Sequence, residues 1–275
     1  MNFDLQTKDT ACKFLLNFMQ MSKSEYLDEY VLKCDSNYEI FWDRNFQKID
    51  SIDISNIRVI AFHVVGSLDD CAEIKETGLK NLQQVLTDNS KLNTLLKSCN
   101  MWFDIGKHKL YYNDKSYDIH YDSHNETKLY TEKEQKLHII ARRIYFDFCI
   151  NGFLTNDDIY SYGTDIHTRP EFIKDLVDAF PNLQKLETEW IQQSKPYKVI
   201  FYSYLNQIDN STFDINNLDD PPYVDWINLS CAQKIKKWML GKAIARVNDS
   251  LPESYLYIKD NLSIPPNQII DCVRI

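Results

Sequence analysis

Apolar residues recur with the period of an α-helix in two long stretches of the chain. The stretch over residues 8–34 predicts one or two N-terminal helices, and residues 131–149 predict one amphipathic helix. Residues 79–100 and 228–248 also read as helices, and the second of these carries a basic face. The apolar positions of the first two stretches are Phe14, Leu15, Phe18, Met19, Tyr26, Tyr30 and Val31, then Leu137, Ile140, Ala141, Ile144, Tyr145 and Phe148.

Strand patterns lie mainly in the later part of the chain. Residues 57–65 form an apolar run rich in β-branched residues, which is typical of a buried strand, and residues 198–205 form another. Residues 253–258 and 268–274 read as two closing strands, and the weak alternation over residues 109–121 predicts a hairpin or a strand pair. Because helices come early and strands late, we expect an α+β fold with N-terminal helices.

Turn and cap residues set boundaries between these elements. Ser67 reads as the cap of a helix that follows the first strand, and Gly78 reads as the residue that ends this helix. Pro170 is expected at the first position of a later helix. Residues 150–168 look irregular, with Gly152 as a breaker. We therefore divide the chain into an N-terminal helical segment, residues 1–50, and a main domain, residues 51–275.

Composition places the chain among globular proteins and predicts a cytoplasmic location. The 275 residues are 44% hydrophobic and 26% charged, and no apolar run approaches the roughly 20 residues of a membrane span. The first residues show no basic segment followed by an apolar one, so we expect no signal peptide. No two of the seven cysteines have metal-knuckle spacing, and we expect reduced thiols. Membrane binding is not expected.

Glycine content and net charge exclude several functional classes. The six glycines form neither a dinucleotide-binding fingerprint nor a P-loop, both of which need clustered glycines. The net charge of −9 argues against nucleic-acid binding through bulk charge. The basic helix face can still meet a nucleic acid locally. Its residues are Lys234, Lys236, Lys237, Lys242 and Arg246.

One pairing of motifs carries a chemical signal. The strand containing His63 is followed by Gly66-Ser67, then Ile74 and Gly78-Leu79, and Glu253 opens a strand near the C-terminus. This arrangement resembles the ADP-ribosyltransferase superfamily and its His-Tyr-Glu clade. Poly(ADP-ribose) polymerase catalytic domains and bacterial DarT-like toxins, which modify nucleic acid, share its general look. The resemblance covers residues 57–79 and 253–275 and the middle only loosely. It implies a split mixed sheet of the ADP-ribosyltransferase type in residues 51–275.

The resemblance also implies an activity, with NAD as the substrate. Breaking the nicotinamide–ribose bond passes through an oxocarbenium-like sugar, which a carboxylate stabilises. Glu253 is the expected catalytic residue, and His63 is expected to hold the adenosine-side ribose. Gly66 and Ser67 belong to the same expected NAD-binding segment. Neither role needs a metal, and none is expected.

Three further residues are candidates for binding NAD. A tyrosine should stack on nicotinamide, and Tyr160 and Tyr162 are the candidates. The family's tyrosine-bearing strand cannot be aligned cleanly here, so the choice stays open. Arg169 precedes a predicted helix N-terminus, where its charge and the free N–H groups can meet the NAD pyrophosphate.

The leading hypothesis is therefore an NAD-dependent mono-ADP-ribosyltransferase, a cytosolic bacterial toxin or antiviral defence effector. Its acceptor would be a nucleic acid, slightly favoured over a protein, and an antitoxin protein is a possible partner. One alternative is a catalytically silent binding protein of the same fold.

A metal-dependent nuclease is the less favoured alternative. It would use Glu134 and Lys136 with Asp118 or Asp122, but its acid-x-Lys spacing falls on a predicted helix rather than a strand. A polar stretch that contains two histidines and two acids also suggests a metal site, although its surroundings look loop-like. These residues are His120, Asp122, His124 and Glu126.

Overall fold

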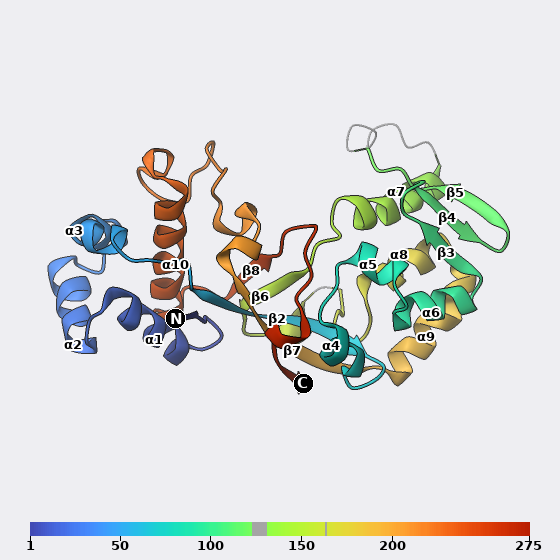
Figure 1. Ribbon diagram of the computed structural model, residues 1–275, viewed down its shortest axis with the longest axis horizontal. Coiled ribbons are helices and arrows are strands. Elements are labelled where there is room, and N and C mark those ends of the chain that lie inside the picture. Colours follow the sequence, from blue (N-terminus) through green and yellow to red (C-terminus); the bar gives the residue numbers. More distant parts are fainter. Residues whose placement is uncertain (123–130, 163) are drawn as a thin grey trace. The chain divides into compact units, whose positions relative to one another are not determined.

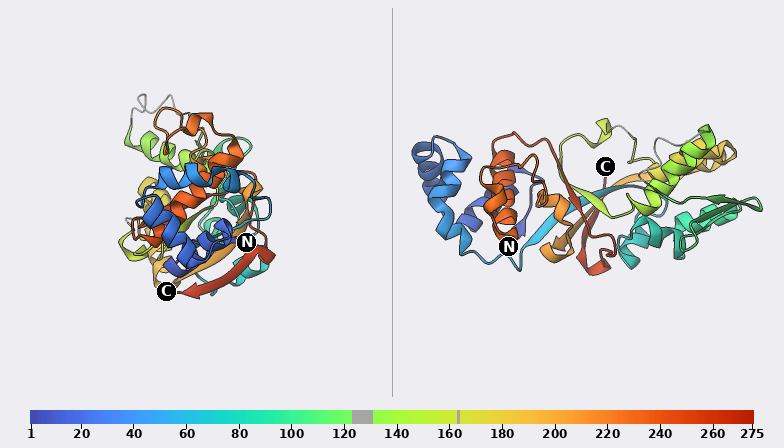
Figure 2. Two further views of the ribbon diagram at one scale, coloured as in Figure 1. Left: turned by 90° about the vertical axis from the view of Figure 1, so that its left-hand side faces the viewer. Right: turned by 90° about the horizontal axis from the view of Figure 1, so that it is seen from above.

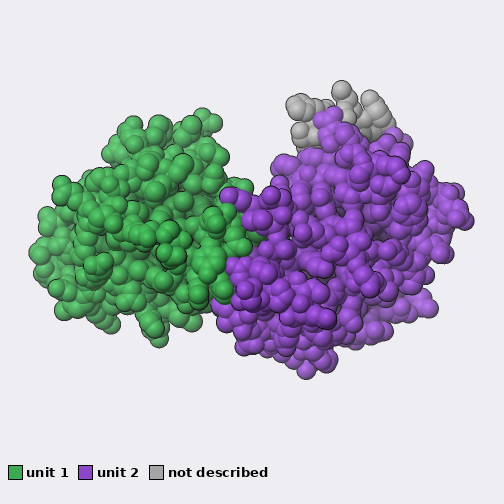
Figure 3. Space-filling view, in the orientation of Figure 1, with its two compact units in different colours: residues 1–62, 151–157, 201–258 green, residues 63–150, 158–200, 259–275 purple. Residues whose placement is uncertain are grey.

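The computed structural model describes residues 1–122, 131–162 and 164–275, and these divide into two compact units. Unit 1 comprises Met1–Phe62, Asn151–Asp157 and Phe201–Ile258, and unit 2 comprises His63–Ile150, Asp158–Ile200 and Lys259–Ile275 (Figure 3). Residues 1–50 lie within unit 1. The chain is an α+β protein, as predicted.

The larger sheet has the strand order β8-β6-β2-β7-β9, with the short β1 paired to β2. The pairs β2–β6 and β6–β8 are antiparallel, whereas β1–β2 is parallel. The strand bounds are β1 Asn2–Phe3, β2 Arg58–Ser67, β6 Asn151–Asn156, β7 Lys195–Tyr204, β8 Glu253–Tyr257 and β9 Ile269–Arg274. The predicted strands at β2, β7, β8 and β9 are therefore confirmed.

The helices of unit 1 gather around α10. α10 contacts both α1 and α3, and the three lie close together in Figures 1 and 2. α10 begins at a reciprocal cap in which Ser230 and Gln233 bond each other's backbone N–H groups. The helices are α1 Lys8–Met19, α2 Lys23–Tyr26, a π-helix Leu27–Lys33, α3 Tyr38–Asp50 and α10 Cys231–Val247.

Four of the five residues of the predicted basic face of α10 are buried and the fifth, Lys242, is half-buried, which overturns the expectation that this face can meet a nucleic acid. Lys234, Lys236, Lys237 and Arg246 are each less than 8% exposed. Their charged groups reach oxygens on segments that are distant in the sequence. The Nζ atoms donate to the carbonyls of Ile215, Asp50 and Val224, and Lys237 also to the Glu39 carboxylate. Buried lysines need such partners, because an unpaired ammonium is costly to desolvate.

Unit 2 has its own apolar core, built between helices and a small three-stranded sheet. The sheet has the order β3-β4-β5, and the predicted hairpin is its β4–β5 pair. Buried residues from α6, β3, α7 and α8 meet there, including Leu96, Met101, Ile140 and Ile173. The strands are β3 Met101–Asp104, β4 Lys109–Tyr112 and β5 Lys115–Asp118. The helices are α4 Ala72–Thr77, α5 Leu82–Thr87, α6 Lys91–Ser98, α7 Glu132–Tyr145, α8 Glu171–Ala179 and α9 Gln184–Gln193.

Residues 79–100 form two short helices, in line with the helical prediction, and β3 follows them directly. Three local predictions were wrong. The segment 150–168 contains the strand β6, whose residues after Asn151 are all buried. α4 begins at Ala72 rather than just after Ser67, although it ends at Gly78 as predicted. Pro170 caps α8 and is not its first helical residue.

Candidate functional site

Glu253 is the first residue of β8 and is exposed to solvent. β8 stands at one end of the strand order, and its neighbour β6 aligns Asn156 opposite Glu253. The Asn156 side-chain Nδ2 donates a hydrogen bond of 3.0 Å to Glu253 Oε2. The carboxylate is thus held at one oxygen by an amide that is itself only 9% exposed.

A β-bulge brings these two side chains to one face of unit 1. Phe153 pairs with Tyr255, whereas Asn156 pairs with Glu253, and the register shifts between Phe153 and Thr155. Glu253 and Tyr255 are two residues apart and share a face, but Phe153 and Asn156 are three apart. The extra residue in β6 therefore turns Asn156 toward the face of Glu253.

Aromatic rings line the same face beside the carboxylate. The Phe153 ring lies 5.4 Å from the ring of Tyr255 and 5.4 Å from that of Phe62, and Tyr255 lies 6.4 Å from Tyr257. The two tyrosines are half-buried. A solvent-facing carboxylate beside aromatic surface can accept hydrogen bonds from a sugar and stabilise positive charge on it.

The other six predicted site residues lie in unit 2. His63 lies in β2 and is half-buried. The Gly66 carbonyl accepts a hydrogen bond of 3.2 Å from Trp190 Nε1. A Cβ atom at Gly66 would lie 2.3 Å from the Thr168 carbonyl oxygen and 3.1 Å from the Arg169 nitrogen. Glycine is therefore required so that the two backbones can approach, and the structure brings Gly66 and Arg169 together.

The Ser67 hydroxyl is engaged by the turn that follows β2. Its Oγ accepts hydrogen bonds from the N–H of Cys71 at 2.8 Å and of Asp69 at 3.3 Å, and it donates to the Asp69 carboxylate at 3.0 Å. Asp70 and Cys71 have φ of 55° and 61°, a left-handed conformation that is costly for non-glycine residues. Ser67 therefore stabilises a strained turn rather than capping a helix.

Asp70 anchors this turn to β7. Its carboxylate accepts hydrogen bonds from Lys195 Nζ at 2.9 and 3.1 Å and from the Tyr197 hydroxyl at 2.7 Å. These side-chain hydrogen bonds hold the pKa of Asp70 below its usual range. Side-chain hydrogen bonds of Ser67 and Asp70 therefore hold the strained turn in place.

Arg169 forms a buried ion pair within unit 2. Its Nε donates to Glu187 Oε1 at 2.5 Å, and its Nη1 donates to the Thr164 carbonyl at 3.0 Å. Both side chains of the ion pair are about nine-tenths buried, at 10% and 11% exposure. The charge of Arg169 is therefore balanced by Glu187, a partner that the sequence did not reveal.

The two candidate tyrosines differ in exposure. Tyr160 is 56% exposed, and its ring meets that of His167 edge-on at 5.0 Å. Tyr162 is half-buried at the end of a short 3-10 helix. Exposure favours Tyr160 as a surface available for stacking.

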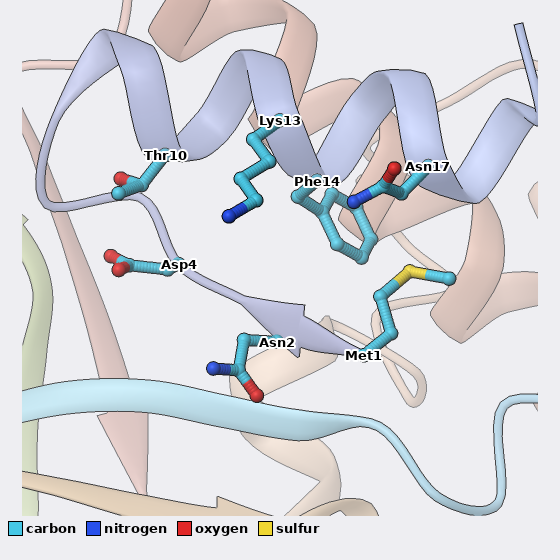
Figure 4. Close-up of a pocket in the computed structure, with 7 residues that line it drawn as sticks. All are labelled: Met1, Asn2, Asp4, Thr10, Lys13, Phe14 and Asn17. Atoms are coloured by element: carbon cyan, nitrogen blue, oxygen red, sulfur yellow. The ribbon is translucent and has the colours of Figure 1, made fainter.

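A separate pocket of about 430 Å³ lies in unit 1 between β1 and α1. In Figure 4 the side chains of Asp4 and Lys13 point into it, with Phe14 and Met1 toward its other end. Asn2, Thr10 and Asn17 complete the lining. None of the predicted site residues lines this pocket.

Glu134 and Lys136, the acid and the lysine of the nuclease alternative, both make contacts at the start of α7. Glu134 accepts hydrogen bonds from the N–H and the hydroxyl of Thr131 at 2.8 Å, so it is the capping acid of α7. Lys136 forms an ion pair of 2.6 Å with Glu132 on the same helix. In the polar cluster considered for a metal, His124 and Glu126 lie outside the described residues. Within the described part of the chain, no three His, Cys, Asp or Glu side chains gather closely enough to hold a metal ion.

Comparisons with known proteins give no family to which the chain can be assigned. No family model, no curated protein and no solved structure matches the chain. Over the described residues, no helix has both the length and the apolar character needed to cross a membrane.

Proposed function

We propose that the chain is an NAD-dependent mono-ADP-ribosyltransferase with Glu253 as its catalytic residue. One observation carries the proposal: Glu253 is exposed at the start of β8, its carboxylate is fixed by Asn156, and aromatic rings lie beside it. The order of the His63 and Glu253 motifs supports the same activity. A fold of the ADP-ribosyltransferase type is part of this proposal.

In the proposed reaction, the bond between the nicotinamide nitrogen and ribose C1′ breaks, and neutral nicotinamide leaves with the bonding electron pair. A nucleophilic oxygen or nitrogen of the acceptor then bonds to C1′ and loses its proton to solvent. Glu253 would stabilise the positive charge on the sugar and accept a hydrogen bond from a ribose hydroxyl. His63 would hold the adenosine-side ribose, and Tyr160 or Tyr162 would stack on nicotinamide.

The remaining predicted residues support the NAD segment in a different way from that expected. Gly66 permits the close approach of the backbone at Thr168, Ser67 holds the strained turn, and Arg169 is paired with Glu187. We therefore assign Gly66, Ser67 and Arg169 to shaping the segment rather than to direct contact with NAD.

The acceptor is proposed to be a macromolecule. Because most basic residues of α10 are buried, they offer little surface for binding a nucleic acid. Protein and nucleic acid are therefore both tested as acceptors. A cytoplasmic bacterial toxin or defence effector controlled by an antitoxin is the proposed biological setting.

The test incubates the protein with adenine-labelled NAD and with separate RNA, DNA and protein fractions of a cell lysate. The wild-type chain should release nicotinamide and label one fraction. Glu253→Gln should lower both by about 100-fold or more, as expected when a transition-state stabiliser is removed. Glu76→Gln, at an exposed position on α4, is the matched control and should keep full activity. The absence of NAD turnover with every fraction would refute the proposal and favour a silent binding protein.

A further inference from the structure

We propose that Asn156 is a positioning residue for Glu253, set in place by the bulge in β6 and by the buried guanidinium of Arg246. This inference rests on the proposed function. Asn156 donates to Oε2 of Glu253, which leaves Oε1 to accept a hydrogen bond from a substrate hydroxyl. Without a partner, an exposed glutamate samples many rotamers, and ordering this long side chain costs conformational entropy.

The bulge destabilises β6 locally, but it also orients Asn156 toward Glu253. It leaves the Thr155 hydroxyl buried, and this hydroxyl has no hydrogen-bond partner among the described residues. Leaving a buried polar group unpaired destabilises the fold, because the group loses its hydrogen bonds to water. A regular β6 would avoid the register shift but would direct Asn156 to the other face, away from Glu253. Bulges occur preferentially beside sites where they redirect one side chain.

Arg246 ties together the two chain segments that carry the pair. Its guanidinium donates to both oxygens of Asp157, the residue after Asn156, at 2.9 and 2.7 Å. It also donates to the Leu251 carbonyl at 3.4 Å, two residues before Glu253. Bonds of 3.0 Å to the carbonyls of Leu5 and Gln6 anchor it further.

Arg246 keeps its positive charge. Hydrogen bonding to Asp157 raises the pKa of Arg246, so it stays charged at all working pH values. A planar guanidinium holds its N–H donors in a fixed fork, whereas a lysine ammonium turns on a flexible stem. The end of β6 and the start of β8 are thus held to one rigid group on α10.

The test compares Asn156→Leu and Asn156→Ala by steady-state kinetics and by direct measurement of NAD affinity. Leucine is close to asparagine in shape and adds no charge, but it cannot donate a hydrogen bond to Glu253. We expect both variants to lower kcat about 10- to 100-fold, as substitutions of residues that orient a reactive group do, with the NAD dissociation constant changed less than threefold. If Asn156 only fills space, Asn156→Leu should resemble the wild type while Asn156→Ala is worse, and that result would overturn the inference.

Two controls separate this result from failure of folding and of the proposed function. Asn151→Leu, on the same strand but paired with Tyr257, should leave kcat unchanged. Nuclear magnetic resonance of the Asn156 side-chain amide provides a readout without turnover. Its protons should exchange slowly with solvent in the wild type and faster in Glu253→Ala.

The outcomes are distinct. An unprotected amide in the wild type would refute the positioning role whether or not NAD is consumed. A protected amide in a chain that does not turn over NAD would support the pair and refute only the proposed function.

Discussion

Replacing Lys237 by methionine tests whether buried lysines hold unit 1 together. The Lys237 side chain is 1% exposed, and its Nζ contacts Glu39 Oε2 at 2.6 Å and the Val224 carbonyl at 2.9 Å. Methionine fills the space of the aliphatic stem but removes both hydrogen bonds. The substitution therefore isolates the contribution of the ammonium group.

The expected loss follows from the exposure of the partner. Removing one member of a buried ion pair costs about 3–5 kcal/mol, because the other charge is left unpaired. The Glu39 side chain is 31% exposed, so water compensates part of this loss. We expect Lys237→Met to lower the free energy of unfolding of unit 1 by about 2–3 kcal/mol. Adding Glu39→Gln should recover part of the loss, because the unpaired carboxylate is then removed.

Lys242→Met is the matched control on the same helix. Its Nζ lies 5.5 Å from the Trp238 ring, and burial lowers the pKa of Lys242, so loss of its charge removes a desolvation penalty. This control should change stability by less than about 0.5 kcal/mol. Hydrogen exchange of α10 amides in low urea measures unit 1 separately from unit 2. If Lys237→Met is as stable as Lys242→Met, the buried lysines are not structural and our interpretation of α10 fails.

Three further results are expected. Gly78→Ala should destabilise unit 2, because Gly78 has φ of 84° and a Cβ atom there would lie 2.0 Å from the Ile264 carbonyl; thermal melting should show a clear fall. Burial raises the pKa of Cys71 to about 12, so its thiol stays protonated at pH 8 and should resist iodoacetamide while the exposed Cys231 is alkylated, as mass spectrometry would show. The lowered pKa of Asp70 means that its bonds to β7 stabilise the fold fully above the unfolded-state pKa of about 3.9 and less as pH falls through the folded-state pKa. Acid titration of Asp70→Asn should therefore lack this component of the stability loss.

Periodicity found helices with one buried face, and an apolar run found the buried strand β2, but neither signal marked β6. The amphipathic helix near residues 131–149 is α7, and its inner face includes Ile140 and Ile144. β6 was missed because its residues from Gly152 to Asn156 are all buried but include Thr155 and Asn156, so they do not form an apolar run. A strand of this kind shows no alternation to detect.

The candidate site was likewise predicted only in part. Glu253 at the start of a strand was predicted from local sequence, and that position is confirmed. Its partner Asn156 was not predicted, because the pairing depends on a register shift in β6. No local signal marks such a shift, since it arises from the alignment of two strands about 100 residues apart.

The sequence by itself determined that α4 ends at Gly78, because this end depends on the backbone conformation of the glycine. Only the tertiary structure decided that the basic residues of α10 are buried. Their charged groups bond to oxygens of segments such as Asp50 and Ile215, and of Asp157 in the case of Arg246. A long, flexible side chain is equally suited to water and to a distant buried acceptor, and only the folded chain determines which of the two it meets.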